Sequence, residues 1–301
     1  MNNVTLRSDK GEKLMNKSRL SFWGFVGPAL LGFTVVVIIP LIFGIYYSFT
    51  DWNGIKSDIN FIGLENYMEV FKDKGFLDSF IFTTKFTIAS VISINIIGFS
   101  LALLVTRGLK ISNVLRTIFF MPNLIGGLIL GFIWQFIFTK AFAALGETIG
   151  AKWLLGWLSN THTGFWGLVI LMAWQMSGYL MIIYIAALQN IPQELIEASK
   201  IDGANAWQRV KHIVFPLVRP AFTVSLFLTL SNSFKLYDQN LSLTGGGPAN
   251  STQMLAMNIY NTAFKFNQMG VAQAKAVIFF IVIGAITLTQ VYISKKGEVE
   301  M

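Results

Sequence analysis

The chain has no cysteine and only two histidines among its 301 residues. It can therefore form no disulfide and no thiolate metal site, and it has no cysteine nucleophile. His162 and His212 are far apart in the sequence, so a histidine metal cluster is not expected. No paired carboxylates or Ser/His arrangement points to a catalytic residue. A phosphate loop of the form Gly-x-x-x-x-Gly-Lys-Ser/Thr is also missing from the sequence. We expect neither a metal nor a cofactor in this chain.

Charged residues are scarce as well. They make up 13% of the chain, whereas 54% of its residues are hydrophobic. A soluble domain usually carries about 25% charged residues, so this chain cannot cover a water-exposed surface and a soluble protein with a very large core is disfavoured. The net charge of +8 raises the question of nucleic acid, but no basic run is interleaved with aromatic residues. We therefore expect a membrane protein that does not bind nucleic acid.

Six apolar stretches have about the 20 residues that a helix needs to cross a bilayer. Backbone amides must be paired within each segment in lipid, so the stretches are interpreted as helices and the fold class as an all-α membrane protein. The first is about 30 residues long without a small-residue cleavage site, which indicates a membrane anchor rather than a signal peptide. The expected transmembrane domain is 21–295, between tails 1–20 and 296–301. The stretches are 22–49, 79–105, 115–139, 164–188, 217–236 and 271–294.

The loops predict the orientation. Most lysines and arginines lie in the segments 7–19, 107–116, 200–219 and 295–296, which alternate with segments on the other side. Basic residues gather on cytoplasmic loops. We therefore expect a multi-pass protein of the cell membrane with both termini in the cytoplasm.

The segment between the fourth and fifth stretches, 190–216, carries the most specific pattern. Pro192 suits the first turn of a helix, and Glu197, Ile201 and Ala204 share one face at helical spacing. Gly203 permits a break, and a second short helix is expected from Trp207 to Val214, ending at Pro216. The pattern predicts two short helices that present small residues to the cytosol.

This segment resembles the signature of permeases of binding-protein-dependent ABC importers: Glu-Ala-Ala, three residues, Gly, nine residues, Ile, one residue, Leu-Pro. Here it reads Glu197-Ala198-Ser199, then Gly203, Ile213 and Phe215-Pro216, with the same spacing. Ser and Phe replace Ala and Leu, which are mild departures. Two further segments look like the maltose and multiple-sugar branch. They are Asp51-Trp52 followed by 61–67, and 243–248 with Ser251-Thr252.

The resemblance, which covers roughly 20–295, implies a mechanism. The loop 189–219 would contain the coupling helix, which inserts into a groove of a separate ATP-hydrolysing subunit. Glu197 would be its charged contact and Gly203 its turn. The implied partners are a second homologous permease, two ATP-binding subunits that hold ATP and magnesium, an extracellular solute-binding protein and a sugar substrate. The coupling residues would be Glu197, Ala198, Ser199, Asp202, Gly203 and Ala204.

Polar and aromatic residues within or just after the stretches are candidates for the substrate path, because polar groups in a membrane are costly and often functional. Interfacial tryptophans and hydrogen bonds between helices are the ordinary alternative. The candidates are Asn95, Trp134, Gln135, Trp174, Gln175, Tyr179, Asn232, Ser233, Tyr237 and Asp238.

Two other functions remain open. An ion-coupled secondary carrier of a small polar solute usually has buried carboxylates near mid-membrane, and no Asp or Glu lies in the middle of a stretch here. An ABC permease for glycerol phosphate or another polyol would want Arg or Lys in the cavity. No Arg lies in mid-stretch, which favours neutral sugars, with an oligosaccharide as the leading candidate.

Overall fold

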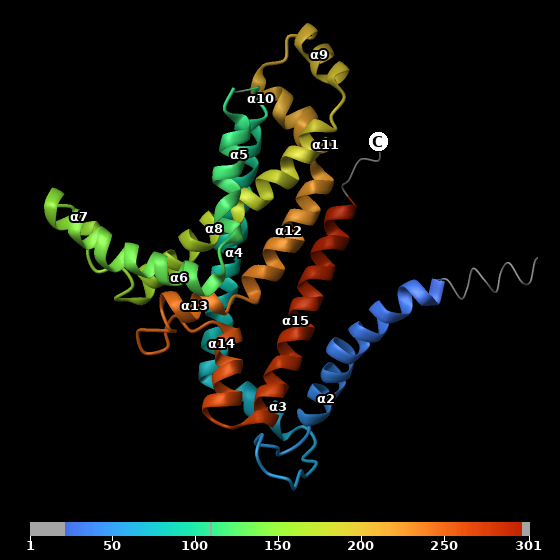
Figure 1. The fold of residues 1–301 in the computed structure, drawn as a ribbon, viewed down its shortest axis with the longest axis vertical. Coiled ribbons are helices and arrows are strands. Elements are labelled where there is room, and N and C mark those ends of the chain that lie inside the picture. The colour runs from blue at the N-terminus through green and yellow to red at the C-terminus, as the bar shows by residue number, and fades with distance from the viewer. Residues whose placement is uncertain (1–21, 109, 297–301) are drawn as a thin grey trace, which may run out of the picture.

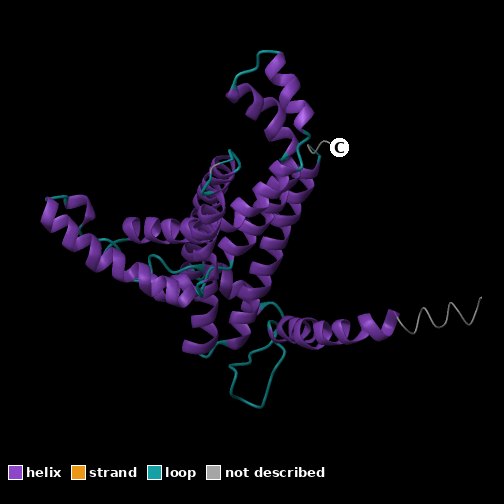
Figure 2. Cartoon of the chain, turned by 45° about the horizontal axis from the view of Figure 1, so that its top comes forward, coloured by secondary structure: helices purple, strands orange, loops and turns teal. Residues whose placement is uncertain are grey.

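The computed structural model describes residues 22–108 and 110–296, and the tail 1–20 lies outside them. Within these ranges the chain forms helices joined by loops, and one isolated bridge between Thr50 and Phe61 is the only strand-like pairing (Figure 1, Figure 2). One long helix is Phe22–Tyr47, whose last part is α2 (Ile39–Tyr47). Other helices that build the bundle are α4 (Lys74–Val105), α8 (Thr161–Gln189), α12 (Arg219–Phe234) and α15 (Met269–Lys295).

Among the described residues, five helices are long and apolar enough to cross a membrane. They are Phe22–Tyr47, Lys74–Val105, Gly127–Ile149, Thr161–Gln189 and Met269–Lys295. A sixth span arises if the bent pair Ala206–Leu217 and Arg219–Phe234, which meet at 70°, is counted as one. The prediction of an all-helical membrane protein with about six spans is confirmed.

α8 forms the centre of the bundle. It packs along α4 and contacts α5 (Ser112–Phe120) and α12. Two glycines allow the close approach that helices in membranes favour. Gly98 of α4 lies against the Ser177 carbonyl, and Gly178 of α8 lies so close to α5 that a Cβ there would overlap the Phe119 carbonyl. α8 is therefore held in place by neighbouring helices on several sides.

The third expected stretch, 115–139, is not one helix. α5 ends at Phe120, the short turn Met121–Leu124 follows, and α6 (Gly127–Phe136) continues into α7 (Phe142–Ile149) in a different direction (Figure 1). Pro122 cannot donate a backbone hydrogen bond and Gly126 is extended, which explains the break. α5 packs on α8, whereas α6 packs on α13 (Asp238–Leu243). The break thus leaves a corner beside α8.

The helix Phe22–Tyr47 leaves the bundle. None of its most apolar window is buried inside the chain, and its α2 end packs only against α15 among the larger helix contacts (Figure 1). Its side chains Phe25, Leu31 and Val36 are mostly exposed. This helix is an arm whose apolar surface needs lipid or another protein as its cover.

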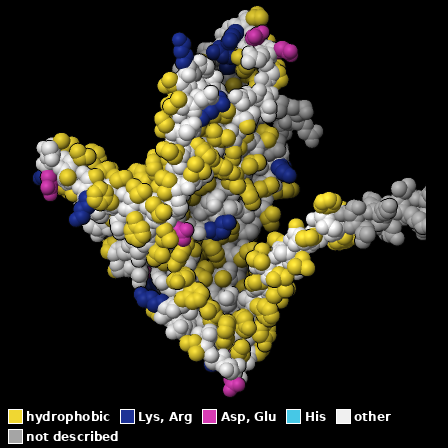
Figure 3. All heavy atoms as spheres, viewed as in Figure 1, with side chains coloured by type: hydrophobic (Ala, Val, Ile, Leu, Met, Phe, Trp, Pro, Cys, Tyr) yellow, Lys and Arg dark blue, Asp and Glu magenta, His cyan; other side chains and the backbone are white. Residues whose placement is uncertain are grey.

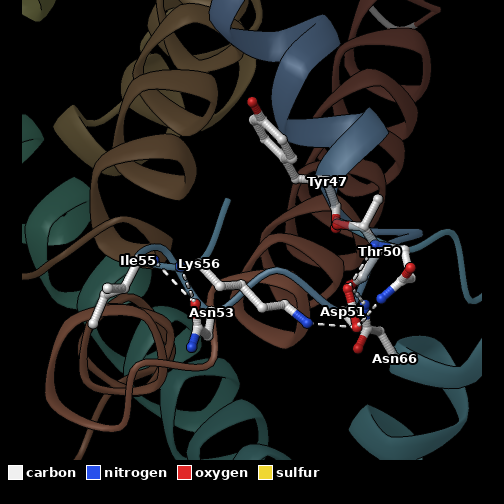
Figure 4. Close-up of polar contacts among 8 residues, drawn as sticks. Tyr47, Thr50, Asp51, Asn53, Ile55, Lys56 and Asn66 are labelled. Atoms are coloured by element: carbon white, nitrogen blue, oxygen red, sulfur yellow. Dashed lines mark hydrogen bonds and ion pairs between the residues drawn. The ribbon is translucent and has the colours of Figure 1, made fainter. Parts of the chain in front are cut away.

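The loop after the arm is held by a polar cluster (Figure 4). Asn66 of α3 (Glu65–Lys72) donates hydrogen bonds to the Ser48 and Thr50 carbonyls at 2.9 and 2.8 Å. Asp51 pairs with Lys56 at 2.5 Å, and its other oxygen accepts from the backbone N–H of Asn60. These contacts hold the pKa of Asp51 at about 2. These hydrogen bonds hold the loop 48–66 in a fixed conformation, and we call this loop the clasp. It lies at the end of the molecule opposite α9 (Gln193–Ile201) and includes Asp51-Trp52 and most of 61–67.

A buried lysine joins three elements at that same end. The Lys275 ammonium of α15 lies 2.7 Å from the carboxylate of Asp73, the N-cap of α4. It also donates to Asn258 at 2.9 Å and to Thr262 at 2.8 Å. The helix α14 (Leu255–Tyr260), which carries Asn258, is thereby fixed to the spans, since a buried charge must be paired and hydrogen-bonded.

Candidate functional site

Two helix faces line an open cavity of about 410 Å³. Met172, Gln175, Met176 and Tyr179 recur at helical spacing on one face of α8. Leu228, Asn232 and Lys235 do the same at the end of α12. Tyr237, Asp238 and Gln239 close the cavity where α13 begins, and Asn123 reaches it from the broken third span.

Two hydrogen bonds fix the polar lining of the cavity. Gln239 donates from its amide to Gln175 Oε1 at 2.8 Å, which joins α13 to α8. Gln175 in turn donates to the Ile125 carbonyl at 3.4 Å, in the corner left by the broken span. Amide, phenol, ammonium and carboxylate groups thus converge on one space beside methionine and leucine side chains. This mixture of apolar surface and a few placed polar groups is typical of a small-molecule site.

Half of the substrate-path candidates line this cavity. The structure brings Gln175, Tyr179, Asn232, Tyr237 and Asp238 together from three helices far apart in the sequence. Tyr179 presents a half-buried ring, while Asn232 and Asp238 are exposed into the opening. A flexible sugar could meet a ring face and several hydrogen-bonding groups here. What these side chains bind stays a prediction.

Asn95 lies away from the cavity. Its Oδ1 accepts a hydrogen bond from the Tyr184 hydroxyl at 2.6 Å, and its amide donates to the Val91 carbonyl and to Thr229 Oγ1 at 3.2 Å. Tyr184 and Thr229 are fully buried. Asn95 therefore ties α4, α8 and α12 together, which is the alternative of hydrogen bonding between helices.

The remaining four candidates are also outside the cavity lining. Trp134 and Trp174 meet edge to face at 5.6 Å and line an apolar groove of about 610 Å³ on the other side of α8. Gln135 donates to the Leu243 carbonyl at 3.2 Å and so joins α6 to α13. Ser233 is fully buried in α12. In both Trp-Gln pairs the tryptophan lines the apolar groove, whereas Gln175 lines the polar cavity and Gln135 joins two helices.

Three polar lining residues were not predicted from the sequence: Asn123, Lys235 and Gln239. Lys235 follows Asn232 by three positions and so shares its helix face. That spacing is visible in the sequence, but Lys235 lies at the end of the stretch 217–236 and was not among the candidates. Asn123 and Gln239 lie in a turn and a short helix whose positions depend on the broken third span.

α9 protrudes from the end of the bundle that lies opposite the clasp around Asp51 (Figure 1). Pro192 precedes its first turn, and Gly203 follows it with a φ of 77°, a left-handed conformation that glycine adopts readily. The next helix begins at Ala206 rather than Trp207 and continues past Pro216 to Leu217. Asn205 and Gln208 cap its start reciprocally at 2.9 and 2.8 Å. The two expected short helices are therefore present, with a longer second one.

The predicted coupling residues lie on and after this protruding helix. Glu197, Ala198, Asp202 and Gly203 are exposed, and Ala204 is half-buried. Ser199 is buried, and its hydroxyl donates to the Ile196 carbonyl at 2.7 Å, so it shapes the turn. Two large apolar side chains that were not selected from the sequence are also exposed here, Ile201 by 87% and Trp207 by 72%. An exposed apolar pair beside small residues is typical of a protein-binding surface.

No group of three or more His, Asp or Glu side chains that could hold a metal occurs in the ranges 22–108 and 110–296. The cavity contains one carboxylate, Asp238, and one ammonium, Lys235. These groups can hydrogen-bond a ligand, and the rings of Tyr179 and Tyr237 offer faces for stacking.

The chain is similar to several known proteins. A family model described as binding-protein-dependent transport system inner membrane component matches residues 94–297. A probable starch degradation products transport system permease protein of Thermoanaerobacterium thermosulfurigenes is 59% identical over 95% of this chain and 97% of its own length. The multiple sugar-binding transport system permease protein of Streptococcus mutans is 33% identical over 95% of this chain and 99% of its own length.

The fold is similar to a solved one. A chain of a bacterial ABC transporter involved in the import of the acidic polysaccharide alginate superposes with a TM-score of 0.82 at 18% identity. The match covers 95% of this chain and 99% of that chain.

Proposed function

Since this chain belongs to the binding-protein-dependent transport system inner membrane components, we propose that it is the permease subunit of an ATP-driven oligosaccharide importer. It would pass a sugar, delivered by an extracellular binding protein, through the cavity beside α8. The observation that carries the proposal is the pairing of this polar cavity with a protruding, exposed α9 on one chain. The names of the relatives, a starch degradation products permease and a multiple sugar permease, support an oligosaccharide cargo.

The coupling step is assigned to α9 and its turn. Glu197 is exposed on α9, and Ile201 and Trp207 offer apolar contact area next to it. A separate ATP-binding subunit would grip this surface, with ATP and magnesium bound there and no ATP site in this chain. Movement of α9 would be transmitted to the cavity through the bent helix pair that follows it in the chain. This pair runs from Ala206 to Phe234 and ends beside Lys235, which lines the cavity.

A second permease subunit would complete the pathway. The cavity is open, and the arm Phe22–Tyr47 extends from the bundle with its apolar surface uncovered by this chain. A homologous subunit would cover the arm and supply the missing wall of the cavity. The lipid bilayer would cover the rest.

Both termini are assigned to the cytoplasm. Lysine and arginine side chains gather around α5, α9 and α10 (Ala206–Arg209) at one end of the molecule (Figure 3). Lys295 and Lys296 follow α15 toward the same end. Basic residues favour the cytoplasmic side, which puts the clasp around Asp51 outside the cell.

The testing experiment uses the chain purified with its partner subunits. We expect vanadate-sensitive ATP hydrolysis that rises with sugar-loaded binding protein. The variant Glu197→Arg should lose transport and bind the ATPase subunits at least tenfold more weakly, while it inserts into the membrane normally. A reversed charge at a central contact costs about 1.4 kcal/mol or more, which is a factor of ten.

Glu147→Arg is the matched control, because Glu147 is an exposed glutamate on α7, away from α9. It should leave ATP hydrolysis and transport unchanged. Wild-type uptake by the Glu197→Arg variant would remove the coupling role. Uptake that survives ATP depletion but stops when the ion gradient collapses would replace the importer by a secondary carrier.

One observation keeps a second cargo class in view. Lys235 gives the cavity a cation that could pair with a phosphate, as a permease for glycerol phosphate requires. Asp238 on the same wall opposes an anionic cargo. A neutral oligosaccharide fits both charges, because each can hydrogen-bond a hydroxyl group.

A further inference from the structure

A second polar cavity lies at the α9 end of the molecule, apart from the substrate cavity. It encloses about 310 Å³ between the end of α4, the start of α5 and the end of α8. Lys110 and Arg116 are its cations, and Asn113 and Gln189 add amide groups. No aspartate or glutamate is among its lining residues, which are Val105, Thr106, Gly108, Lys110, Ser112, Asn113, Arg116 and Gln189.

The guanidinium of Arg116 is incompletely satisfied. Its Nε is buried and has no hydrogen-bond partner in the part of the chain that the structure describes. Within those residues the ion pairs are Lys56 with Asp51 and Lys275 with Asp73, so neither Lys110 nor Arg116 has a carboxylate partner. A buried donor of a charged group is costly unless it is paired. A partner that accepts hydrogen bonds and carries negative charge would satisfy both cations.

The hydroxyl groups at the cavity do not supply that partner. Thr106 donates to the Ala102 carbonyl at 2.8 Å, and Ser112 donates to the Val105 carbonyl at 2.9 Å. The cations are therefore the groups that remain to bind a ligand. Two positive charges and two amides match a phosphate group, for which arginine is the preferred residue.

We propose that this cavity binds a phosphate group, carried by a phospholipid headgroup or present as free phosphate. The apolar groove beside Trp134 and Trp174 reaches Leu101 on α4 and Ile118 on α5. Leu101 lies about one turn from Val105 on α4, and Phe119, which also lines the groove, lies about one turn from Arg116 on α5. A phospholipid could therefore place its headgroup on Arg116 and an acyl chain along the groove, whereas free phosphate would use the cavity alone.

The ordinary enrichment of basic residues at one membrane surface is the competing explanation. Lys295 and Lys296 at the end of α15 provide the comparison, since they lie at the same end but outside the cavity lining. Surface enrichment predicts that neutralising either pair weakens lipid binding equally. A specific phosphate site predicts that only neutralisation of Lys110 and Arg116 weakens lipid binding.

The experiment is native mass spectrometry on the full-length chain, delipidated in detergent with the subunits that copurify. It is titrated with phosphatidylglycerol, with phosphatidylcholine and with inorganic phosphate. We expect Lys110→Gln with Arg116→Gln to weaken binding of one phosphatidylglycerol, or of inorganic phosphate, by about tenfold. Lys295→Gln with Lys296→Gln should bind like wild type. Binding of phosphatidylglycerol but not inorganic phosphate identifies the lipid; binding of both identifies the phosphate group alone.

Equal loss in the two double variants, or no loss in the cavity pair, would overturn the proposal. The single variant Lys110→Gln is the safeguard if the cavity pair does not fold, because Lys110 is exposed. It should weaken binding severalfold without lowering the melting temperature.

Discussion

Among single residues, Asp73 offers the clearest dependence on pH. Burial would raise the pKa of its carboxyl, but the hydrogen bond and charge of Lys275 and the backbone N–H groups of Phe76 and Gly75 outweigh it and lower the pKa from its ordinary value of 3.8. A lowered pKa means that ionised Asp73 stabilises the folded state above pH 3.8. That contribution is lost as the pH falls through the folded-state pKa.

The variant Asp73→Asn should therefore unfold more easily at pH 7 by about 2 kcal/mol. This is less than for a fully buried pair, because one third of the Asp73 side chain is exposed. Asparagine still caps α4, so the loss reports the ion pair. Thermal unfolding in detergent should show a constant difference from wild type down to about pH 5 and a shrinking one below pH 3.8. A difference independent of pH would mean that the charge has no part in it.

The cavity residues separate the two cargo classes. Tyr179→Ala removes the ring that a sugar would stack on, and we expect uptake of a maltooligosaccharide to fall about tenfold or more. Lys235→Gln keeps hydrogen-bond donors and removes the charge, so uptake of a neutral sugar should change less than about threefold. Radiolabelled uptake in cells measures both. Uptake of glycerol phosphate that is lost in Lys235→Gln and kept in Tyr179→Ala would favour a phosphate cargo.

The sequence predicted which polar residue types would lie within the spans, but not which of them line the cavity. Gln175 and Gln135 follow tryptophan in the same way, yet one lines the cavity and the other bonds the Leu243 carbonyl. Composition and position in a span are the same for both. What separates them is which neighbouring helix each glutamine meets, and that depends on tertiary packing.

Among the elements, α5 and α8 show how closely two helices can pack. Gly178→Ala would place a methyl group on the Phe119 carbonyl, so we expect a loss of about 1–3 kcal/mol in stability. Gly284→Ala on α15 is the matched control, because no atom lies within 4 Å of its added Cβ. It should be neutral or slightly stabilising. Melting temperatures in detergent test the pair; an equal change in both variants would show that the close packing of Gly178 against Phe119 does not affect stability.

The elements also show where periodicity stops being informative. Long apolar stretches predicted α4, α8 and α15 well, since their length and composition suffice to define a span. The stretch 115–139 looked equally apolar but breaks around Pro122 and Gly126. Proline is tolerated within many membrane helices, so hydropathy alone does not reveal whether it kinks or ends one. The position of Asn123 in the lining of the cavity beside α8 was missed for this reason.

On the scale of the whole molecule, the two ends differ in kind. One end carries α9 and the basic segments, and the other carries the clasp around Asp51 and the buried Lys275. The cavity lies between them, at the point where the bent pair from Ala206 to Phe234 ends. The pattern of charges along the sequence predicted that 107–116, 200–219 and 295–296 share an end, because this prediction needs only the number of spans between them, and the segment 7–19 lies outside the described residues.

The absence of cysteine makes this arrangement directly testable in cells. Lys56→Cys places one thiol in the clasp loop, and Lys296→Cys places one after α15. If the α9 end is cytoplasmic, a membrane-impermeant maleimide should label Lys56→Cys in intact cells and Lys296→Cys only after permeabilisation. Asp202→Cys should behave like Lys296→Cys, because it lies in the turn after α9. The cysteine-free parent gives the background, so even weak labelling is interpretable. Labelling of Asp202→Cys in intact cells would place α9 outside and remove the surface that an ATPase could grip.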